Sequence, residues 1–124
     1  MKIYVAGKWE DRDIIKYIQR SLIKDEHKIT CDWTNHSSHS HSMEYAIADL
    51  EGVRNCNLLI AYMMHEYIYK GAWAEIGAAL ILNKPVIIIG NRADSGIFVH
   101  HPLVHKVNNI QEMLDYLQTI IHIK

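Results

Sequence analysis

The chain has 124 residues, 49% of them hydrophobic and 22% charged, with a formal net charge of -1 at pH 7, so residues 1–124 are expected to form one domain. This charge balance argues against DNA or RNA as the partner, because nucleic-acid binding draws on a surplus of Lys and Arg. The apolar runs are far shorter than the roughly 20 residues that span a bilayer, and the charged start lacks the apolar region of a secretory signal, so we expect no membrane segment and a cytoplasmic setting.

The apolar pattern predicts short strands that alternate with helices. In chain order we predict a strand at Lys2–Ala6, a helix at Asp13–Lys24, a strand at Lys28–Trp33, a polar loop at 34–42, a helix at 43–55, a strand at Leu58–Met63, a helix at about 71–82, a strand at Val86–Ile89, a short strand near His105–Val107 and a helix at Ile110–Ile123. This alternation is typical of a parallel sheet with helices on both faces. We therefore expect an α/β, flavodoxin-like, doubly wound sheet of about five strands, with ligands at the carboxyl ends of the strands.

Glu75 is the most informative candidate. Residues 71–83 are apolar all round the predicted helix except for this carboxylate, and a helix of that kind is buried on every side. The prediction also places Glu75 in the first turn, where the helix dipole favours the ionised form by about 0.3 to 1 kcal/mol. An anionic oxygen in a confined pocket suits nucleophilic attack; the alternative is an ordinary first-turn Glu that favours the helix start. The same helix offers apolar residues to a second subunit at Ala74, Ala78 and Ile81.

Asp49 is the second candidate carboxylate. The apolar residues of the helix at 43–55 line one face at Met43, Ala46, Ile47, Leu50 and Val53. Asp49 stands beside this stripe, from which it could reach the same crevice as Glu75. Two carboxylates that flank a glycosidic bond are the usual equipment for its cleavage. By itself, Asp49 would be an ordinary solvated helix charge.

The remaining signals are weaker. Gly7 would let a ligand approach the backbone closely, and Lys8 and Arg12 could hold a phosphate, although the chain has no complete dinucleotide-binding or Walker motif. Cys31 and Cys56 cannot form a disulfide scaffold or a zinc site alone, so buried thiols are expected. A cluster of histidines lies within six residues, at His36, His39 and His41. Their spacing favours a polar loop over a metal site.

Four segments in the same order resemble the nucleoside 2-deoxyribosyltransferase family: Ile3–Gly7, Asp49–Ala61, Gly71–Ala79 and Lys84–Val86. The resemblance spans most of the chain from Lys2 to about Ile89. Members of this family are flavodoxin-like oligomers that cleave the N-glycosidic bond of deoxynucleosides or deoxynucleotides. Some pass the sugar to a second base, and others pass it to water.

The resemblance implies a role for each matching position. Glu75, in the Gly-x-x-x-Glu-x-Gly stretch that begins at Gly71, would be the nucleophile that forms a covalent glycosyl-enzyme. Asp49 would handle the base and its proton. Tyr4 and Gly7 would line the sugar side. The phosphate candidates are Lys8 and Arg12, although their loop does not have the pattern of the deoxynucleotide-cleaving branch.

Two departures from the family pattern concern the base. Asn57 stands where many members have Asp, and Tyr69 stands where the transferase branch has an Asp six residues before the nucleophile. Base recognition would then fall to Asp49, Tyr69, Trp9 or the histidine-rich loop. Hydrolysis is consequently as plausible as transfer.

We therefore expect an enzyme that cleaves a deoxynucleoside or its 5′-monophosphate through Glu75, without a metal or organic cofactor, as a homodimer or larger assembly. One alternative is a non-catalytic nucleotide-binding module on the same fold. Another is a glycohydrolase of a ribonucleotide or an NAD-like compound.

Overall fold

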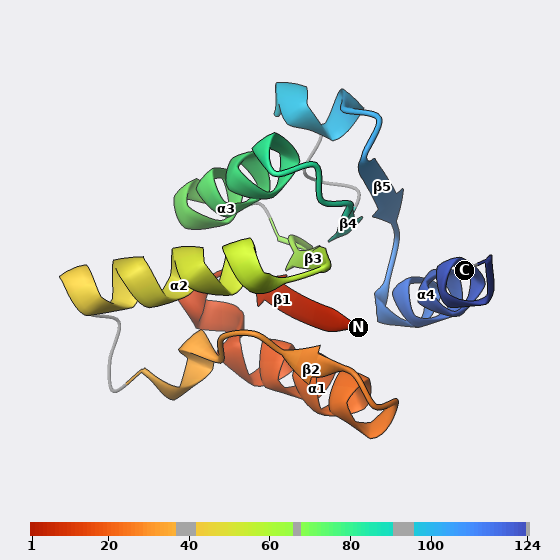
Figure 1. The fold of residues 1–124 in the computed structure, drawn as a ribbon, viewed down its shortest axis with the longest axis horizontal. Coiled ribbons are helices and arrows are strands. Elements are labelled where there is room, and N and C mark those ends of the chain that lie inside the picture. Colours follow the sequence, from red (N-terminus) through yellow and green to blue (C-terminus); the bar gives the residue numbers. More distant parts are fainter. Residues whose placement is uncertain (37–41, 66–67, 91–95, 124) are drawn as a thin grey trace.

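Five short strands form one parallel sheet in the computed structural model, which describes residues 1–36, 42–65, 68–90 and 96–123 (Figure 1). The strands are β1 (Lys2–Ala6), β2 (Lys28–Ile29), β3 (Leu58–Tyr62), β4 (Val86–Ile89) and β5 (Val104–Val107). Their spatial order is β2-β1-β3-β4-β5, and every neighbouring pair is parallel. This is the doubly wound, flavodoxin-like order that the alternating pattern predicts.

Helices cover both faces of the sheet. They are α1 (Arg12–Lys24), α2 (Met43–Asn55), α3 (Lys70–Ile81) and α4 (Ile110–Ile123). Figure 1 shows α2 and α3 side by side on one face, with α1 and α4 on the other. Within the described parts of the chain, none of the helices has the length and hydropathy needed to cross a bilayer.

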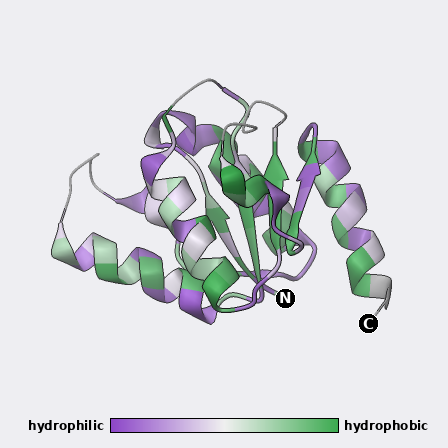
Figure 2. Ribbon diagram, turned by 90° about the horizontal axis from the view of Figure 1, so that it is seen from above, coloured by the Kyte–Doolittle hydropathy of each residue, from purple (hydrophilic) through white to green (hydrophobic). Residues whose placement is uncertain are grey.

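The core lies along the three central strands. Every residue of β3 and β4 is buried, as is β1 from Ile3 onward. The uninterrupted hydrophobic strands stand out at the centre of Figure 2, with more hydrophilic helices around them. Strands buried on both faces need no alternation of apolar and polar residues, which is why these runs are short and continuous in the sequence.

The second strand is shorter than predicted. Its pairing with β1 ends at Ile29, whereas the apolar pattern favoured a strand as far as Trp33. The Asp32 side chain accepts a hydrogen bond from the Thr34 backbone at 3.1 Å and caps a short 3-10 helix. A local side-chain bond of this kind competes with strand pairing. The Trp33 indole then donates to the Val5 carbonyl at 2.7 Å, so its ring packs beside the sheet and not within it.

The apolar stripe of α2 faces solvent for most of its length. Val53 is buried, but Met43, Ile47 and Leu50 are 76%, 56% and 51% exposed. Helical periodicity correctly predicts which residues share a face, but it does not say what covers that face. Within the described chain α2 approaches the sheet mainly through its last turns, at Gly52 and Val53.

Gly52 allows α2 to approach the buried residues of the site closely. A Cβ atom at this position would lie 2.6 Å from Cβ of Cys31 and 2.9 Å from Cδ2 of Tyr4. Its carbonyl accepts a hydrogen bond from the Thr30 hydroxyl at 2.7 Å. The glycine therefore sets the distance between α2 and the end of the sheet.

We predict that Gly52→Ala destabilises the fold. In a helix interior, alanine is more favourable than glycine by roughly 0.5 to 1 kcal/mol. Overpacking of a tight contact, however, costs about 1 to 3 kcal/mol. The free energy of unfolding, measured by urea denaturation, should therefore fall. The control is Glu51→Ala, which removes only an exposed ion pair with Arg54 and should change stability by less than about 0.5 kcal/mol. A Gly52→Ala variant more stable than the parent would contradict the close approach.

Candidate active site

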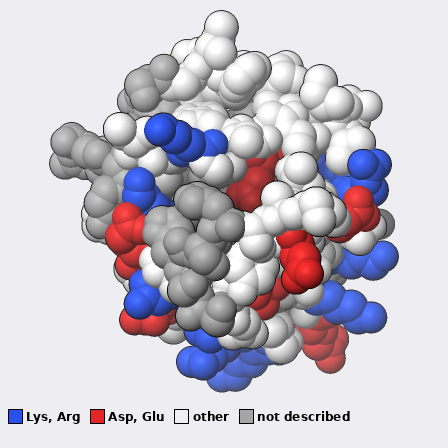
Figure 3. All heavy atoms as spheres, turned by 90° about the vertical axis from the view of Figure 1, so that its left-hand side faces the viewer, with Lys and Arg blue, Asp and Glu red and all other residues white. Residues whose placement is uncertain are grey.

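A cavity of about 610 Å³ lies beyond the carboxyl ends of β1 and β3. Eight of the nine predicted site residues line it: Tyr4, Gly7, Lys8, Trp9, Asp49, Tyr69, Gly71 and Glu75. On this side of the molecule, acidic atoms lie recessed among uncharged ones (Figure 3). The volume falls within the range of about 300 to 1,000 Å³ that is usual for small-molecule sites.

Glu75 and Tyr4 join α3 to the central strand β1. The Tyr4 hydroxyl donates a hydrogen bond to Oε2 of Glu75. Tyr4 is fully buried, and burial raises the pKa of its phenol well above the ordinary value. The phenol therefore keeps its proton and remains a donor, which orients the carboxyl group within the cavity.

The Glu75 carboxyl has a strongly perturbed pKa. Burial raises the pKa from 4.5 to about 8; the hydrogen bond from Tyr4 opposes the increase, and the nearby Asp49 adds to it. A carboxylate with this pKa keeps much of its nucleophilic character once it is ionised, because few water molecules solvate it. Perturbed groups of this kind cluster at functional sites.

The environment of Glu75 differs from the prediction in two respects. The α3 helix begins at Lys70, so Glu75 lies in the second turn, and stabilisation by the helix dipole in the first turn does not apply. The helix is also not buried on every side, because Ala74 and Ile81 are exposed. Its sequence is apolar all round, yet it leaves one face uncovered.

Asp49 reaches the cavity from α2 and is half-buried. Burial raises the pKa of its carboxyl, although the nearby His36 and a hydrogen bond from Cys31 lower it. The Cys31 thiol lies 3.6 Å from Oδ1 of Asp49, and Nε2 of His36 lies 3.9 Å from the same oxygen. The structure thus brings two carboxyl groups with raised pKa values into one cavity.

The basic residues of the first loop are placed differently from one another. Lys8 lines the cavity, and its Nζ donates to the Ile68 carbonyl at 2.9 Å. Arg12 does not line the cavity, because it begins α1 and donates to the Trp9 carbonyl at 3.1 Å. Its guanidinium lies 4.7 Å from the centre of the Trp9 ring. Lys70 at the start of α3 does line the cavity, although its position in the sequence gave no signal.

The structure also shows the surroundings of the other residues that the family resemblance singled out. A Cβ atom at Gly7 would lie 2.3 Å from Cδ1 of Ile15, so α1 requires the glycine whether or not a ligand approaches. Gly71 has open space around it. The Tyr69 hydroxyl accepts a hydrogen bond from the His65 backbone at 3.1 Å. Asn57 lies at the other end of the sheet, where its side chain accepts from the Lys2 backbone at 2.9 Å.

The structure adds two aromatic residues to the cavity lining that the sequence did not single out, next to His36 of the histidine-rich loop. Trp33 and Tyr45 line the cavity together with His36. The His36 ring stacks on Tyr45, with ring centres 3.6 Å apart and an interplanar angle of 3°. The spacing of the histidines in the sequence does not predict this stacking, because Tyr45 belongs to the following helix. His39 and His41 lie outside the described residues.

We predict that Glu75→Gln stabilises the fold at high pH. Between its ordinary pKa of 4.5 and its folded value of about 8, the folded chain binds a proton that the unfolded chain releases, so stability falls as pH rises. Glutamine cannot ionise. The variant should therefore exceed the parent in free energy of unfolding by more than about 1 kcal/mol near pH 9 and match it only below the unfolded pKa, at about pH 4.

Urea unfolding at the two pH values measures this difference, and Glu51→Gln on exposed α2 surface is the control. An equal effect of Glu75→Gln at both pH values would show that burial does not perturb this carboxyl group.

Solved structures with the same fold include enzymes that act on nucleosides and nucleotides. The chain is similar to the CMP N-glycosidase of Clostridium botulinum, with a TM-score of 0.72, 18% identity, and coverage of 97% of this chain and 99% of that one. A 2-deoxyribosyltransferase of Bacillus psychrosaccharolyticus has a TM-score of 0.68 and 19% identity, with coverage of 94% and 92%. A conserved protein of Enterococcus faecalis has a TM-score of 0.67 and 18% identity, with coverage of 96% and 98%.

No curated protein is similar enough in sequence to count as a relative. The family model for nucleoside 2-deoxyribosyltransferase, however, matches residues 3–110. That span holds all five strands except Lys2, the first residue of β1, together with α1, α2, α3 and every described residue that lines the cavity. The chain therefore belongs to the nucleoside 2-deoxyribosyltransferase family.

Proposed function

We propose that the protein cleaves the N-glycosidic bond of a 2′-deoxynucleoside or its 5′-monophosphate through a covalent intermediate on Glu75, and passes the sugar to water or to another base. The observation that carries this proposal is the position of the Glu75 carboxyl group. It accepts a hydrogen bond from Tyr4 and lines a cavity that Asp49 also lines. Family membership supports the reaction class.

The first step forms the glycosyl-enzyme. The reactive form holds one proton on Asp49 and none on Glu75, and it is the minority form near pH 7 because the pKa of Glu75 is about 8. In this form an oxygen of Glu75 attacks C1′ of the sugar while the bond from C1′ to the base nitrogen breaks, and the electron pair leaves with the base. The transition state resembles an oxocarbenium ion, whose positive charge the carboxylate stabilises in a poorly solvated cavity. A sugar without a 2′-hydroxyl forms this cation more readily.

Asp49 serves as the proton donor to the departing base. Its raised pKa keeps the carboxyl protonated to a higher pH than an ordinary aspartate. General-acid assistance of this kind contributes about 10² to 10⁴-fold to the rate. In the second step, water or another base attacks C1′, the ester to Glu75 breaks, and the proton that the acceptor loses returns to Asp49.

The cationic side of the cavity suits a 5′-phosphate. Lys8 and Lys70 both line the cavity, and they come from the loop after β1 and the start of α3. Arg12 lies outside the lining, so we assign it no direct contact with the phosphate. Trp9, Tyr69 and His36 also line the cavity, and we assign base recognition to them.

A ribonucleotide is the second candidate substrate. The likeness to a CMP N-glycosidase over nearly the whole chain favours it. In the deoxy-specific case, the buried Tyr4 ring excludes the 2′-hydroxyl; in the ribonucleotide case, the cavity accommodates it. Comparison of dCMP with CMP distinguishes the two.

We predict that Glu75→Gln lowers the rate of base release by roughly 10³-fold or more, because a neutral amide cannot form the glycosyl-enzyme. Asp49→Asn should lower it by about 10² to 10⁴-fold. The measurement is chromatography of free base released from a panel of deoxynucleosides, their monophosphates, CMP and NAD, with and without an acceptor base.

Glu51→Gln is the matched control, because Glu51 is an exposed carboxylate two residues from Asp49 on the same helix. Tight nucleotide binding with no base released from any compound would contradict the enzyme and favour a non-catalytic binding module.

We also propose that the protein works as a homodimer or larger homo-oligomer. Two adjacent helices leave apolar stripes uncovered: Met43, Ile47 and Leu50 on α2, and Ala74 and Ile81 on α3. Ala78, the third residue predicted for the α3 stripe, is half-buried. The exposed fraction of Ile81 reaches 83%. A second copy of the chain would remove these side chains from water, and symmetric pairing is the commonest form of assembly.

We predict that Ile47→Glu and Ile81→Glu each convert the assembly to monomers, because a buried, unpaired carboxylate opposes association. Size-exclusion chromatography with light scattering measures the mass. The control is Ile23→Glu, since Ile23 is another exposed isoleucine, on α1 at the opposite face of the sheet. A monomeric parent protein would overturn this proposal.

A further inference from the structure

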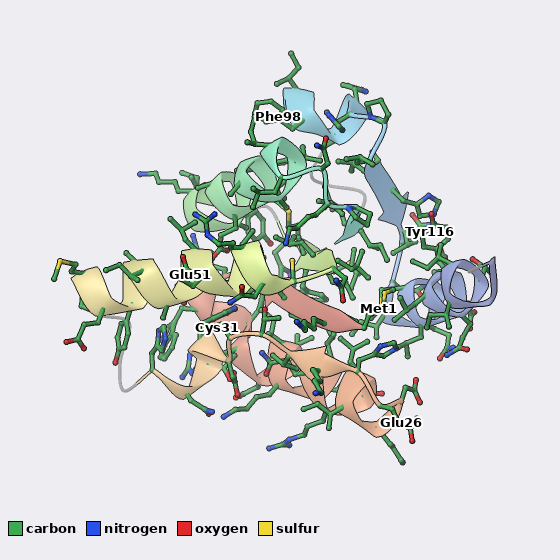
Figure 4. The ribbon with its side chains drawn as sticks, in the orientation of Figure 1. Met1, Glu26, Cys31, Glu51, Phe98 and Tyr116 are labelled. Atoms are coloured by element: carbon green, nitrogen blue, oxygen red, sulfur yellow. The ribbon has the colours of Figure 1, made fainter. Side chains whose placement is uncertain are left out.

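We propose that Cys31, His36 and Asp49 form a binding site for Zn²⁺ or a similar divalent transition metal, and that the bound metal inhibits the enzyme by occupying Asp49. The site lies at the edge of the cavity and joins two residues of the segment after β2 to one residue of α2. Cys31 belongs to the loop that follows β2 and lies next to α2 (Figure 4). His36 ends the 3-10 helix of that loop, and Asp49 belongs to α2.

The three ligand atoms are already close to the separations that a metal requires. Sγ of Cys31 lies 3.6 Å from Oδ1 of Asp49, and Nε2 of His36 lies 3.9 Å from that oxygen. The ligand atoms all lie within 4.8 Å of one another. Tetrahedral zinc bonds place neighbouring ligand atoms about 3.3 to 3.6 Å apart, so shifts on the order of 1 Å or less close the site.

Packing holds two of the ligands in place. The His36 ring stacks on Tyr45, at a centre-to-centre distance of 3.6 Å, and Tyr45 belongs to the same helix as Asp49. The side chains of His36 and Asp49 are 17% and 28% exposed. They are therefore accessible to a metal ion from solvent but restricted in their rotamers. Pre-positioned ligands lose less conformational entropy when a metal binds.

The donor set selects the class of metal. A thiolate, an imidazole and a carboxylate suit Zn²⁺, whereas Mg²⁺ and Ca²⁺ prefer oxygen ligands alone. Three protein ligands leave a fourth position for water. When the metal binds, the thiol releases its proton to solvent and a metal–sulfur bond forms, with no change in oxidation state. The two cysteines alone were too few to suggest zinc, and the site became evident only when the fold brought His36 and Asp49 to Cys31.

The inhibitory effect rests on the proposed function. Asp49 lines the cavity and is proposed to deliver a proton to the departing base. A carboxylate oxygen that coordinates a metal cannot carry this proton. Removal of the metal by a chelator restores the carboxyl group, so the inhibition is reversible.

Titration of the metal-free protein with Co²⁺ alone tests the site, because a cobalt–thiolate bond has a charge-transfer absorption that histidine and carboxylate ligands do not produce. We expect one equivalent to bind with this absorption, and Zn²⁺ to displace it. The band should persist in Cys56→Ser, since Cys56 is buried elsewhere and donates to the Val53 carbonyl. It should be absent in Cys31→Ser.

Equilibrium dialysis with Zn²⁺ gives the affinity of each variant. Mutation of a residue that only hydrogen-bonds to a metal ligand weakens metal binding by about 10 to 100-fold. Loss of a ligand itself, in His36→Ala or Cys31→Ser, should therefore weaken Zn²⁺ binding by about 100-fold or more. Circular dichroism verifies that both variants fold. Absence of the thiolate band in the parent protein, or its persistence in Cys31→Ser, would overturn the site.

Rates of base release with and without Zn²⁺ test the inhibition, expressed as a ratio for each variant. We expect at least a tenfold loss in the parent and Cys56→Ser, restored by chelator, and a ratio near one in Cys31→Ser. A thiolate band without inhibition would confirm the metal site and overturn the inhibitory effect. Absence of turnover in the metal-free parent would count against the proposed function alone, because the cobalt titration does not depend on it.

Discussion

The contact between Tyr4 and Glu75 is the interaction on which the organisation of the site depends. It joins the most buried part of the sheet to a helix that is otherwise apolar after Lys70. Burial of Glu75 raises its pKa to about 8, which weakens the fold at high pH. The hydrogen bond from Tyr4 partly offsets this cost. A carboxyl group in this setting destabilises the chain at high pH and suits the nucleophilic role that we propose for it.

A second constraint is the close approach of α2 to the end of the sheet. Gly52 leaves space for Cys31 and the Tyr4 ring, and one turn earlier Asp49 enters the cavity. The same contact places Cys31 within 3.6 Å of Asp49. The proposed catalytic site and the proposed metal site therefore share one cause, which is the packing distance that a residue without a side chain permits.

The order of strands and helices could be predicted from the sequence, because strands buried on both faces are continuous apolar runs. Glu75 could be predicted as well, since a lone carboxylate in an apolar helix is rare enough to notice. The end of β2 could not be predicted from the sequence, because the cap at Asp32 and the hydrogen bond of the Trp33 indole depend on neighbours in space. Lys70 and Tyr45 have no distinguishing local pattern in the sequence. Arg12 fits a phosphate ligand by sequence, but in the structure its guanidinium stacks on Trp9.

The sequence by itself determined the doubly wound fold, the family and the two carboxylates, since these follow from periodicity and from motifs that are local in the chain. Only the tertiary structure decided which side chains meet. The pairing of Tyr4 with Glu75, the stack of His36 on Tyr45 and the uncovered stripe of α2 each join residues or faces whose relation depends on how helices pack on the sheet. Local patterns specify which face a residue occupies, whereas packing distances between elements specify what that face contacts.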